Sequence, residues 1–385
     1  MLDEKLLMTP GPTMIPTRVL EIMRRQIIHH RTSDYEDSFD ELCENLKTVF
    51  KTKNTVMTLA SSGTGVMEAA VVNLFSPGDA VLAVTVGAFG DRFVEIAKAY
   101  GLDVKVMSFE WGKPADPAKI AAALADDTER RIKGVLITHN ETSTGVTNDI
   151  EAVAKYTKDT ERLLIVDAIS SMGALELDMD GWGVDAVATG SQKALMNAPG
   201  LGFAALSDKA WEAYKKSALP KFYWDLGKYR DGIAKISENP PYTPAITLAL
   251  AQNEAVKIML EEGLDNIYAR HKKYALATQA GVASLGLELL PELRFSSYVI
   301  TAVKPPAGVD IGKVIKDMNV SYDVMVVGGQ KSLKGKLLRI GHCGYFNGHD
   351  LLRAFSALEM SLSGAGYKLE PGVSLAAVQK ALNVK

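Results

Sequence analysis

The sequence predicts an α/β protein with two domains: a large domain whose mainly parallel sheet is flanked by helices, and a smaller C-terminal α+β domain. Two observations carry this prediction. Strand-like and helical stretches alternate over roughly the first two hundred residues, which indicates a parallel sheet with helices on both faces. Several strand candidates, such as 163–166, are unbroken apolar runs, and such runs are typical of strands buried on both faces.

The chain begins with an arm before the alternation starts. Residues 9–16 contain three prolines and a glycine, so we expect an extended segment there rather than a helix. Helical spacing begins near residue 17. The expected strands are 55–60, 80–86, 104–108, 134–138, 163–166 and 186–189, and the expected helices are 66–74, 90–100, 117–125 and 149–156.

Beyond about residue 205 the rhythm changes. Residues 219–244 are proline-rich and irregular, and two long helical patterns follow, 245–261 and 264–284, with Gly263 between them. We therefore expect a domain boundary at this glycine. The expected divisions are an arm over 1–16, a large domain over 17–262 and a small domain over 263–385, with small-domain strands near 297–303 and 337–340 and a helix near 351–363.

Composition excludes several classes of function. The 43 Lys and Arg residues are balanced by 46 Asp and Glu residues, so no basic surface for nucleic acid or an anionic membrane is expected. Cys43 and Cys343 lie far apart and no histidines show ligand spacing, so we expect no disulfide framework and no metal site. The chain has no apolar run of membrane-spanning length and no secretory signal, so we expect a cytoplasmic protein.

Ligands of open α/β sheets bind beyond the carboxyl ends of the strands. Residues 61–65, Ser-Ser-Gly-Thr-Gly, follow a strand and open a helix, so their backbone N–H groups could bind an anion. An ordinary helix cap is the alternative. A nicotinamide-dinucleotide fingerprint is only half matched, because Glu68 replaces its third glycine.

Three charged residues stand at or after other strands. Asp167 ends a buried strand, where a carboxylate must be paired or hydrogen-bonded. Lys193 follows another strand, and burial there would lower its pKa and make it a nucleophile for carbonyls. Arg339 lies among apolar residues and needs a carboxylate partner, internal or ligand. A helix-terminal anion site, an aspartate, a lysine and an arginine are together the set that a pyridoxal 5′-phosphate enzyme requires.

At this point the sequence resembles a known family, the class V aminotransferases of pyridoxal-phosphate fold type I, and most closely the serine–glyoxylate and alanine–glyoxylate aminotransferases. The resemblance runs over nearly the whole chain. The segments that carry it are 9–12, 62–65, 138–145, 166–167, 190–193 and 338–341.

The resemblance implies roles for these residues. Lys193 would form the Schiff base with pyridoxal phosphate and carry the proton of the transfer, and Asp167 would pair with the pyridinium nitrogen. The residues implied to hold the phosphate are Ser62, Gly63, Thr64 and Gln192.

The ring of the cofactor would be held by three further side chains. Thr142 would hydrogen-bond near the phenolic oxygen, and Ile169 would pack under the ring. Phe89 stands where many members of the family place a tryptophan over the ring. Phenylalanine keeps the stacking but lacks the indole N–H. We therefore expect the catalytic efficiency to differ while the type of reaction stays the same.

The remaining implied residues bind the substrate or reach a second subunit. Arg339 would grip the substrate carboxylate, and Gly11 would let the arm close over the substrate. Tyr242 and Thr243 would reach the phosphate of the neighbouring subunit, which implies a homodimer with shared sites. No second arginine for a dicarboxylic substrate is evident in the sequence.

The expected activity is the transfer of the amino group of alanine or serine to glyoxylate, which gives glycine and a 2-oxo acid by a ping-pong mechanism. Ureidoglycine and phosphonate aminotransferases are alternatives within the class. A cysteine desulfurase is disfavoured, because such enzymes commonly carry a histidine where Gln192 precedes the lysine, and Cys343 is not expected on a mobile loop. A hydrogenase-associated, non-catalytic subunit is the remaining alternative, although a chain without activity should have lost Lys193 or Asp167.

Overall fold

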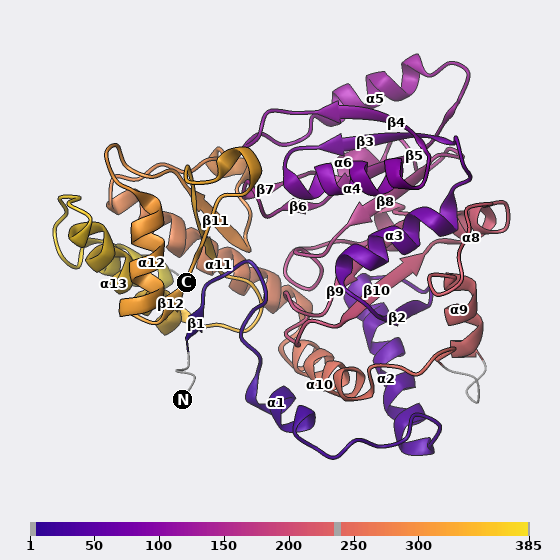
Figure 1. Cartoon of the computed structure of the whole chain (residues 1–385), viewed down its shortest axis with the longest axis horizontal. Helices are drawn as coiled ribbons and strands as arrows, with labels where there is room; N and C mark the ends of the chain where they lie inside the picture. The colour runs from indigo at the N-terminus through magenta and orange to yellow at the C-terminus, as the bar shows by residue number, and fades with distance from the viewer. Residues whose placement is uncertain (1–4, 235–239, 384–385) are drawn as a thin grey trace.

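The computed structural model describes residues 5–234 and 240–383, and a seven-stranded sheet lies at its centre (Figure 1). The strand order is β2-β10-β9-β8-β5-β3-β4. The neighbours are parallel except that β10 runs antiparallel to both β2 and β9. The strands are β2 (Val56–Ala60), β3 (Ala80–Thr85), β4 (Asp103–Ser108), β5 (Ile132–Thr138), β8 (Leu163–Asp167), β9 (Ala186–Gly190) and β10 (Leu201–Leu206). The predicted α/β class with a mainly parallel sheet is confirmed.

Helices cover both faces of this sheet, because successive side chains of each buried strand point to opposite faces. In β8, Leu163 and Ile165 pack into one apolar cluster, whereas Leu164 and Val166 pack into the other. The first cluster is covered by α3 (Gly63–Leu74), α4 (Ala88–Ala99), α8 (Asp208–Tyr214) and α9 (Leu226–Ala234). The second is covered by α2 (Ser33–Phe50), α5 (Pro117–Asp126), α6 (Ile150–Ala154), α7 (Met179–Trp182) and α10 (Ile246–Glu262).

Strand β10 is an element that the sequence pattern did not predict. Gly202 interrupts its apolar run, and an interior glycine weakens a strand signal. The structure explains the glycine, since a Cβ at this position would lie 2.2 Å from Cγ2 of Val66 on α3. Close approach of α3 to the sheet therefore requires a residue without a side chain here.

The C-terminal part of the chain builds a second, smaller sheet of three antiparallel strands in the order β11-β14-β13. Its apolar core includes Phe355 and Leu358, both buried. The strands are β11 (Ile300–Val303), β13 (Val327–Gly328) and β14 (Leu338–Gly341), and the helices are α11 (Leu264–Ser284), α12 (Ile311–Ser321), α13 (Gly348–Gly364) and α14 (Val373–Leu382). Short elements are β6 (Asn140–Glu141), β7 (Val146–Thr147), η2 (Leu293–Phe295) and η3 (Lys331–Leu333).

The N-terminal arm links these two parts. Its strand β1 (Leu6–Leu7) pairs in parallel with β12 (Val324–Met325) beside the C-terminal helices, and α1 (Thr17–Met23) then packs against α10. Between β1 and α1 the arm crosses to the large sheet (Figure 1). The domain divisions at 16 and 262 stay a prediction.

Within residues 5–234 and 240–383, no helix combines the length and the apolar character needed to cross a lipid bilayer. In the same part of the chain, no group of three or more His, Cys, Asp or Glu side chains is arranged to hold a metal ion.

Candidate active site

A small cavity of about 110 Å³ opens where β5, β8 and β9 end. It gathers nine of the residues that the sequence indicated, together with three that it did not. The lining residues are Ser62, Gly63, Thr64, Phe89, Arg92, Asn140, Thr142, Asp167, Ile169, Ser170, Gln192 and Lys193. The carboxyl ends of parallel strands therefore converge on one site, as the fold class requires.

Lys193 follows β9 and is 8% exposed. Burial lowers the pKa of its amine, so a larger fraction is unprotonated than for a lysine in water. Its Nζ donates a hydrogen bond to the carbonyl of Pro10. A neutral, partly desolvated amine is the form that attacks a carbonyl carbon.

The arm covers this lysine closely. Gly11 has a φ of +130°, which L residues with side chains rarely adopt, and a Cβ there would lie 2.4 Å from Cδ of Lys193. Thr13 donates from Oγ1 to the carbonyl oxygen of Lys193 at 3.1 Å. Only glycine allows the arm to pass so near the amine, which agrees with the expected place of Gly11.

Asp167 ends β8 and is 2% exposed. Its carboxylate accepts hydrogen bonds from the Ile169 N–H at 2.9 Å and from Thr138 Oγ1 at 3.3 Å. Burial raises its pKa to about 6, and the nearby Glu141 carboxylate adds to the rise. A buried carboxylate of this kind gains most from a partner that carries a proton and a positive charge, such as a pyridinium N–H.

The start of α3 forms another part of the cavity wall. The Ser62 side chain accepts from the Gly65 N–H at 3.4 Å, and the N–H groups of the first helical turn point out of the helix toward the cavity end. Gly63 faces Ile169, since a Cβ there would lie 2.6 Å from Ile169 Cδ1. Among the described residues, the buried Oε1 of Gln192 has no hydrogen-bond partner. These groups fit a phosphate and a flat ring, as pyridoxal phosphate would supply.

Glu141 is a buried carboxylate that the sequence analysis did not single out, although it lies in the 138–145 segment. Its Oε2 accepts from the N–H groups of Phe89 and Gly90 at 3.1 and 3.0 Å, at the start of α4. Ser143 Oγ donates to its Oε1 at 2.6 Å. Burial raises the pKa of Glu141. By accepting from the Phe89 and Gly90 N–H groups, its carboxylate fixes the backbone that carries the Phe89 ring.

Arg92 corrects one expectation, because a second arginine does line the cavity. Its guanidinium lies 4.8 Å from the centroid of the Phe89 ring, and its Nη1 donates to Thr64 Oγ1 at 3.2 Å. Arg92 comes three residues after Phe89 on α4, and this helical spacing was the available signal. Asn140 and Ser170 were also missed; they form a hydrogen bond of 2.9 Å across the ends of β5 and β8.

Arg339 on β14 does not line the cavity itself, but it adjoins the wall. It is 3% exposed, and its guanidinium donates to the carbonyls of Thr142 and Gly328, both at 2.9 Å. Burial lowers its pKa to about 10, so it keeps its charge at neutral pH. It is a fixed cation behind the Thr142 wall.

Tyr242 and Thr243 lie outside the cavity of their own chain. Tyr242 donates from Oη to the Phe222 carbonyl at 2.9 Å and stacks on Tyr223 with ring centroids 5.2 Å apart, and Thr243 is exposed. Their role at a neighbouring subunit stays a prediction.

Both cysteines are buried and free. Cys343 packs with Ala194 and Val299, and burial raises the pKa of its thiol to about 12. Such a thiol is poorly ionised, which is the opposite of what a nucleophilic cysteine needs.

This fold and this set of side chains define a pyridoxal-phosphate-dependent transaminase of fold type I. The chain belongs to the class V aminotransferase family, whose model matches residues 6–340.

Particular relatives differ in the names they carry. The chain is 39% identical to a serine–glyoxylate aminotransferase of Methylorubrum extorquens, over 98% of this chain and 95% of that protein. It is 42% identical to a protein of Anabaena cylindrica named soluble hydrogenase 42 kDa subunit, over 98% of each chain. The crystal structure of ureidoglycine–glyoxylate aminotransferase from Bacillus subtilis superposes with a TM-score of 0.95 at 28% identity, over 100% of this chain and 99% of that one.

Proposed function

We propose that the protein transfers the amino group of alanine or serine to glyoxylate, giving glycine and a 2-oxo acid in a ping-pong reaction. The observation that carries the proposal is the close cover over Lys193, where Gly11 leaves no room for a Cβ beside the lysine side chain. A cover this near the reacting amine favours donors with small side chains. Relatives named glyoxylate aminotransferases point to the same acceptor.

When bound, pyridoxal phosphate supplies an electron-withdrawing ring that stabilises negative charge on the substrate α-carbon. We assign the remaining work to the protein. Asp167 holds a proton on the ring nitrogen, and the start of α3 holds the phosphate at Ser62, Gly63 and Thr64. Phe89 and Ile169 would pack against the ring, Thr142 would hydrogen-bond near its phenolic oxygen, and Gln192 would join the residues that hold the phosphate.

Lys193 is the proposed proton carrier. Its unprotonated Nζ would accept the α-proton of the donor and hold it for transfer. Its release from the Pro10 carbonyl is part of this step, since the same atom makes that hydrogen bond. Arg339 provides the charge that orients the substrate carboxylate.

Arg92 favours a second candidate, a donor with two carboxylates. Its guanidinium lines the cavity and makes one hydrogen bond to a neutral hydroxyl, that of Thr64. A neutral partner leaves its charge available for a second carboxylate. Aspartate must therefore be tested beside alanine and serine.

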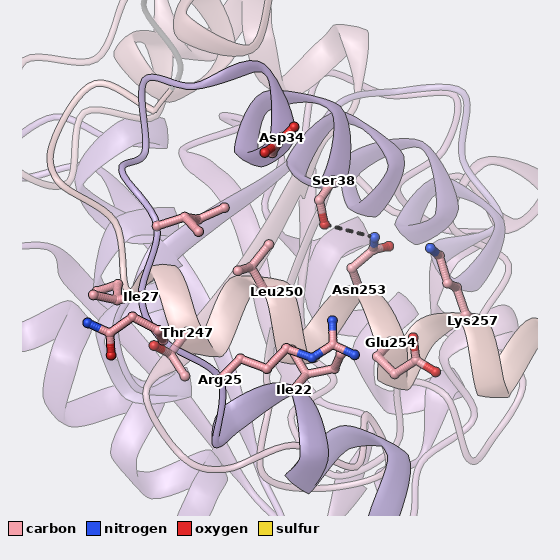
Figure 2. A pocket seen from close by; sticks show the side chains of 12 residues that line it. Ile22, Arg25, Ile27, Asp34, Ser38, Thr247, Leu250, Asn253, Glu254 and Lys257 are labelled. Carbon is pink, nitrogen blue, oxygen red and sulfur yellow. Dashed lines mark hydrogen bonds between the residues drawn. The ribbon is translucent and has the colours of Figure 1, made fainter.

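We also propose that the protein works as a homodimer. A groove of about 340 Å³ lies between α1, the start of α2 and α10, and Figure 2 shows Ile22, Arg25 and Leu250 around it. Ile27 beside it is 58% exposed. Thr243 lies just before α10, which forms one side of this groove, so the 242–243 segment would lie close to the proposed interface. The cytoplasmic location stays a prediction.

The dimer has a direct test. Ile27→Glu places a charge at the groove, and we expect sedimentation to show monomers and transamination to fall at the same time. The control is Val320→Glu, an exposed apolar residue of α12 away from the groove. A dimer that persists in Ile27→Glu would show that the second copy binds elsewhere.

The donor is tested by half-reactions with the holoenzyme. Alanine, serine and aspartate are each added without acceptor, and the 2-oxo acid formed is measured against one equivalent per subunit. Glyoxylate is then added and glycine is measured. Rapid conversion of alanine or serine supports the proposal. Preference for aspartate, lost in Arg92→Leu, would replace it with the second candidate. Formation of alanine from cysteine, with sulfide released by an added thiol reductant, would favour a desulfurase.

A further inference from the structure

A second and larger cavity, of about 580 Å³, lies between the large sheet and the C-terminal part of the chain. One wall comes from the loops after β5, β7 and β8, and the other comes from α11 and the η2 segment. It shares no lining residue with the candidate active site. Its volume lies within the range of small-molecule sites, which is roughly 300–1,000 Å³.

His139 is one of the buried polar residues that line this cavity, with Asn148 and Ser296. It is 4% exposed, and its Nδ1 has no hydrogen-bond partner among the described residues. Its ring meets the edge of Trp182 at a centroid distance of 6.5 Å. A buried polar atom without a partner costs free energy. This atom is itself closed off from solvent, and other atoms of His139 line the cavity.

The opposite wall is aromatic and positively charged. Tyr268, Phe295 and Tyr298 line it, and the Lys272 ammonium lies 5.9 Å from the Tyr298 ring centroid. In the described part of the chain, no carboxylate lies within ion-pair distance of Lys272.

Two other charged side chains of the cavity form ion pairs, and a third, Asp149, caps a helix and keeps its negative charge. Glu176 pairs with Lys51 at 2.6 Å, and Arg294 pairs with Glu292 at 3.0 Å. Asp149 accepts from the Ala152 N–H at 2.9 Å as the cap of α6. Lys272, which is exposed to solvent, is therefore the cation of this cavity that makes no ion pair among the described residues, and it lies beside aromatic rings.

We propose that this cavity binds a planar aromatic molecule that carries a single acidic group. The ring packs against the aromatic wall, the acid group pairs with Lys272, and a polar ring atom or substituent bonds to His139. An aromatic ring and an anion next to a lysine satisfy both sets of groups at once.

The position of His139 connects such a ligand with the active site. The backbone N–H of His139 donates to the backbone carbonyl of Asp167 at 2.9 Å. The preceding residue, Thr138, donates from Oγ1 to the Asp167 carboxylate. A ligand that spans both walls also fixes the C-terminal part against the strand ends. The second site is therefore placed to regulate the transaminase, and its occupancy can be measured without any turnover.

The experiment is a calorimetric titration of the holoenzyme with 2-naphthoate as the probe, alone and in the presence of saturating glyoxylate. We expect one molecule to bind per chain, with an affinity that glyoxylate leaves unchanged. Lys272→Ala should weaken binding roughly threefold to tenfold, as expected for loss of one partly exposed charge pair. The matched control is Lys273→Ala, which removes the neighbouring exposed lysine outside the cavity.

A second variant fills the space instead of removing charge. Ala269 lines the cavity and is exposed on α11, so Ala269→Trp should fold and should abolish binding. The wild type should bind uncharged 2-naphthamide more weakly than 2-naphthoate. Lys272→Ala should bind the two probes with equal affinity. The proposal is overturned if 2-naphthoate does not bind, if glyoxylate displaces it, or if neither variant changes its affinity.

Discussion

The two sheets of this protein each bury a cation near the same cavity, and they hold it in different ways. Lys193 follows the large sheet and donates to the Pro10 carbonyl of a crossing arm, and burial lowers the pKa of its amine. Arg339 of the small sheet donates to two carbonyls and keeps its charge, with a pKa of about 10. The lysine thus lies under a segment from another part of the chain, whereas the arginine is held by carbonyls of two segments.

The largest effect should come from the reacting side. Lys193→Ala removes the proton carrier, so we expect kcat to fall on the order of 10⁴-fold with little change in melting temperature. Borohydride treatment followed by intact-mass analysis should find cofactor attached to the wild type and not to the variant. Lys133→Ala, at an exposed position on β5, is the control. Normal turnover in Lys193→Ala would show that Lys193 is not the reacting group, so it would no longer differ from Arg339 in this respect.

The next prediction concerns Asp167, the carboxylate that lines the same cavity as Lys193. Asp167→Asn should lower kcat by about 10²–10³-fold, because a preorganised charge is lost. In the cofactor-free protein the pKa of Asp167 is raised from 3.8 to about 6, so between these values the folded state holds a proton that the unfolded state has released. Its stabilisation is therefore present at low pH and is lost as pH rises through 6, by up to about 3 kcal/mol.

The measurement is denaturant unfolding of both cofactor-free proteins from pH 4 to pH 7.5. The free energy of unfolding of the wild type, relative to that of Asp167→Asn, should fall as pH rises through 6. Contributions from other titrating groups, such as buried histidines, are the same in both proteins and cancel. A constant difference would show that Asp167 is not titrating in this range.

The next prediction concerns Gly11 in the arm that covers Lys193. Gly11→Ala would bring a Cβ within 2.4 Å of Lys193 Cδ, at a φ of +130°, so either the arm or the lysine must shift. A displacement near 1 Å at a reacting atom costs about 10²-fold in kcat. Gly78→Ala is matched in having a positive φ of +82° but has open space around it. If both variants lose activity equally, backbone strain and not contact with Lys193 is responsible.

The smallest effect should come from the fixed side. Arg339→Lys keeps a charge but loses the planar group that reaches two carbonyls, so we expect KM for the amino donor to rise roughly tenfold with kcat changed much less. Initial rates over a range of donor concentrations give both constants. A loss confined to kcat would place Arg339 with the reacting groups.

Sequence reasoning located the groups that stand at strand ends. Asp167, Lys193 and the start of α3 were found because a charged or small residue after an apolar strand is unusual by itself. Arg92, Asn140 and Ser170 were missed, since their positions depend on contacts between separate elements. Glu141 was inside a recognised segment, but its bonds to Phe89 and Gly90 join residues about fifty positions apart.

The arm also sets an order of events during synthesis. Leu6 pairs with Val324, and the Gly341 N–H donates to the Met8 carbonyl at 2.7 Å, so the first residues of the arm gain these anchors only after residues 324–341 have left the ribosome, whereas Thr13 and α1 contact Lys193 and α10, which are made earlier. The lysine and its aspartate can be in place well before that moment. A nascent chain halted before Val324 would therefore lack the strand pairing that fixes the beginning of the arm, although the segment beside Lys193 could already be held.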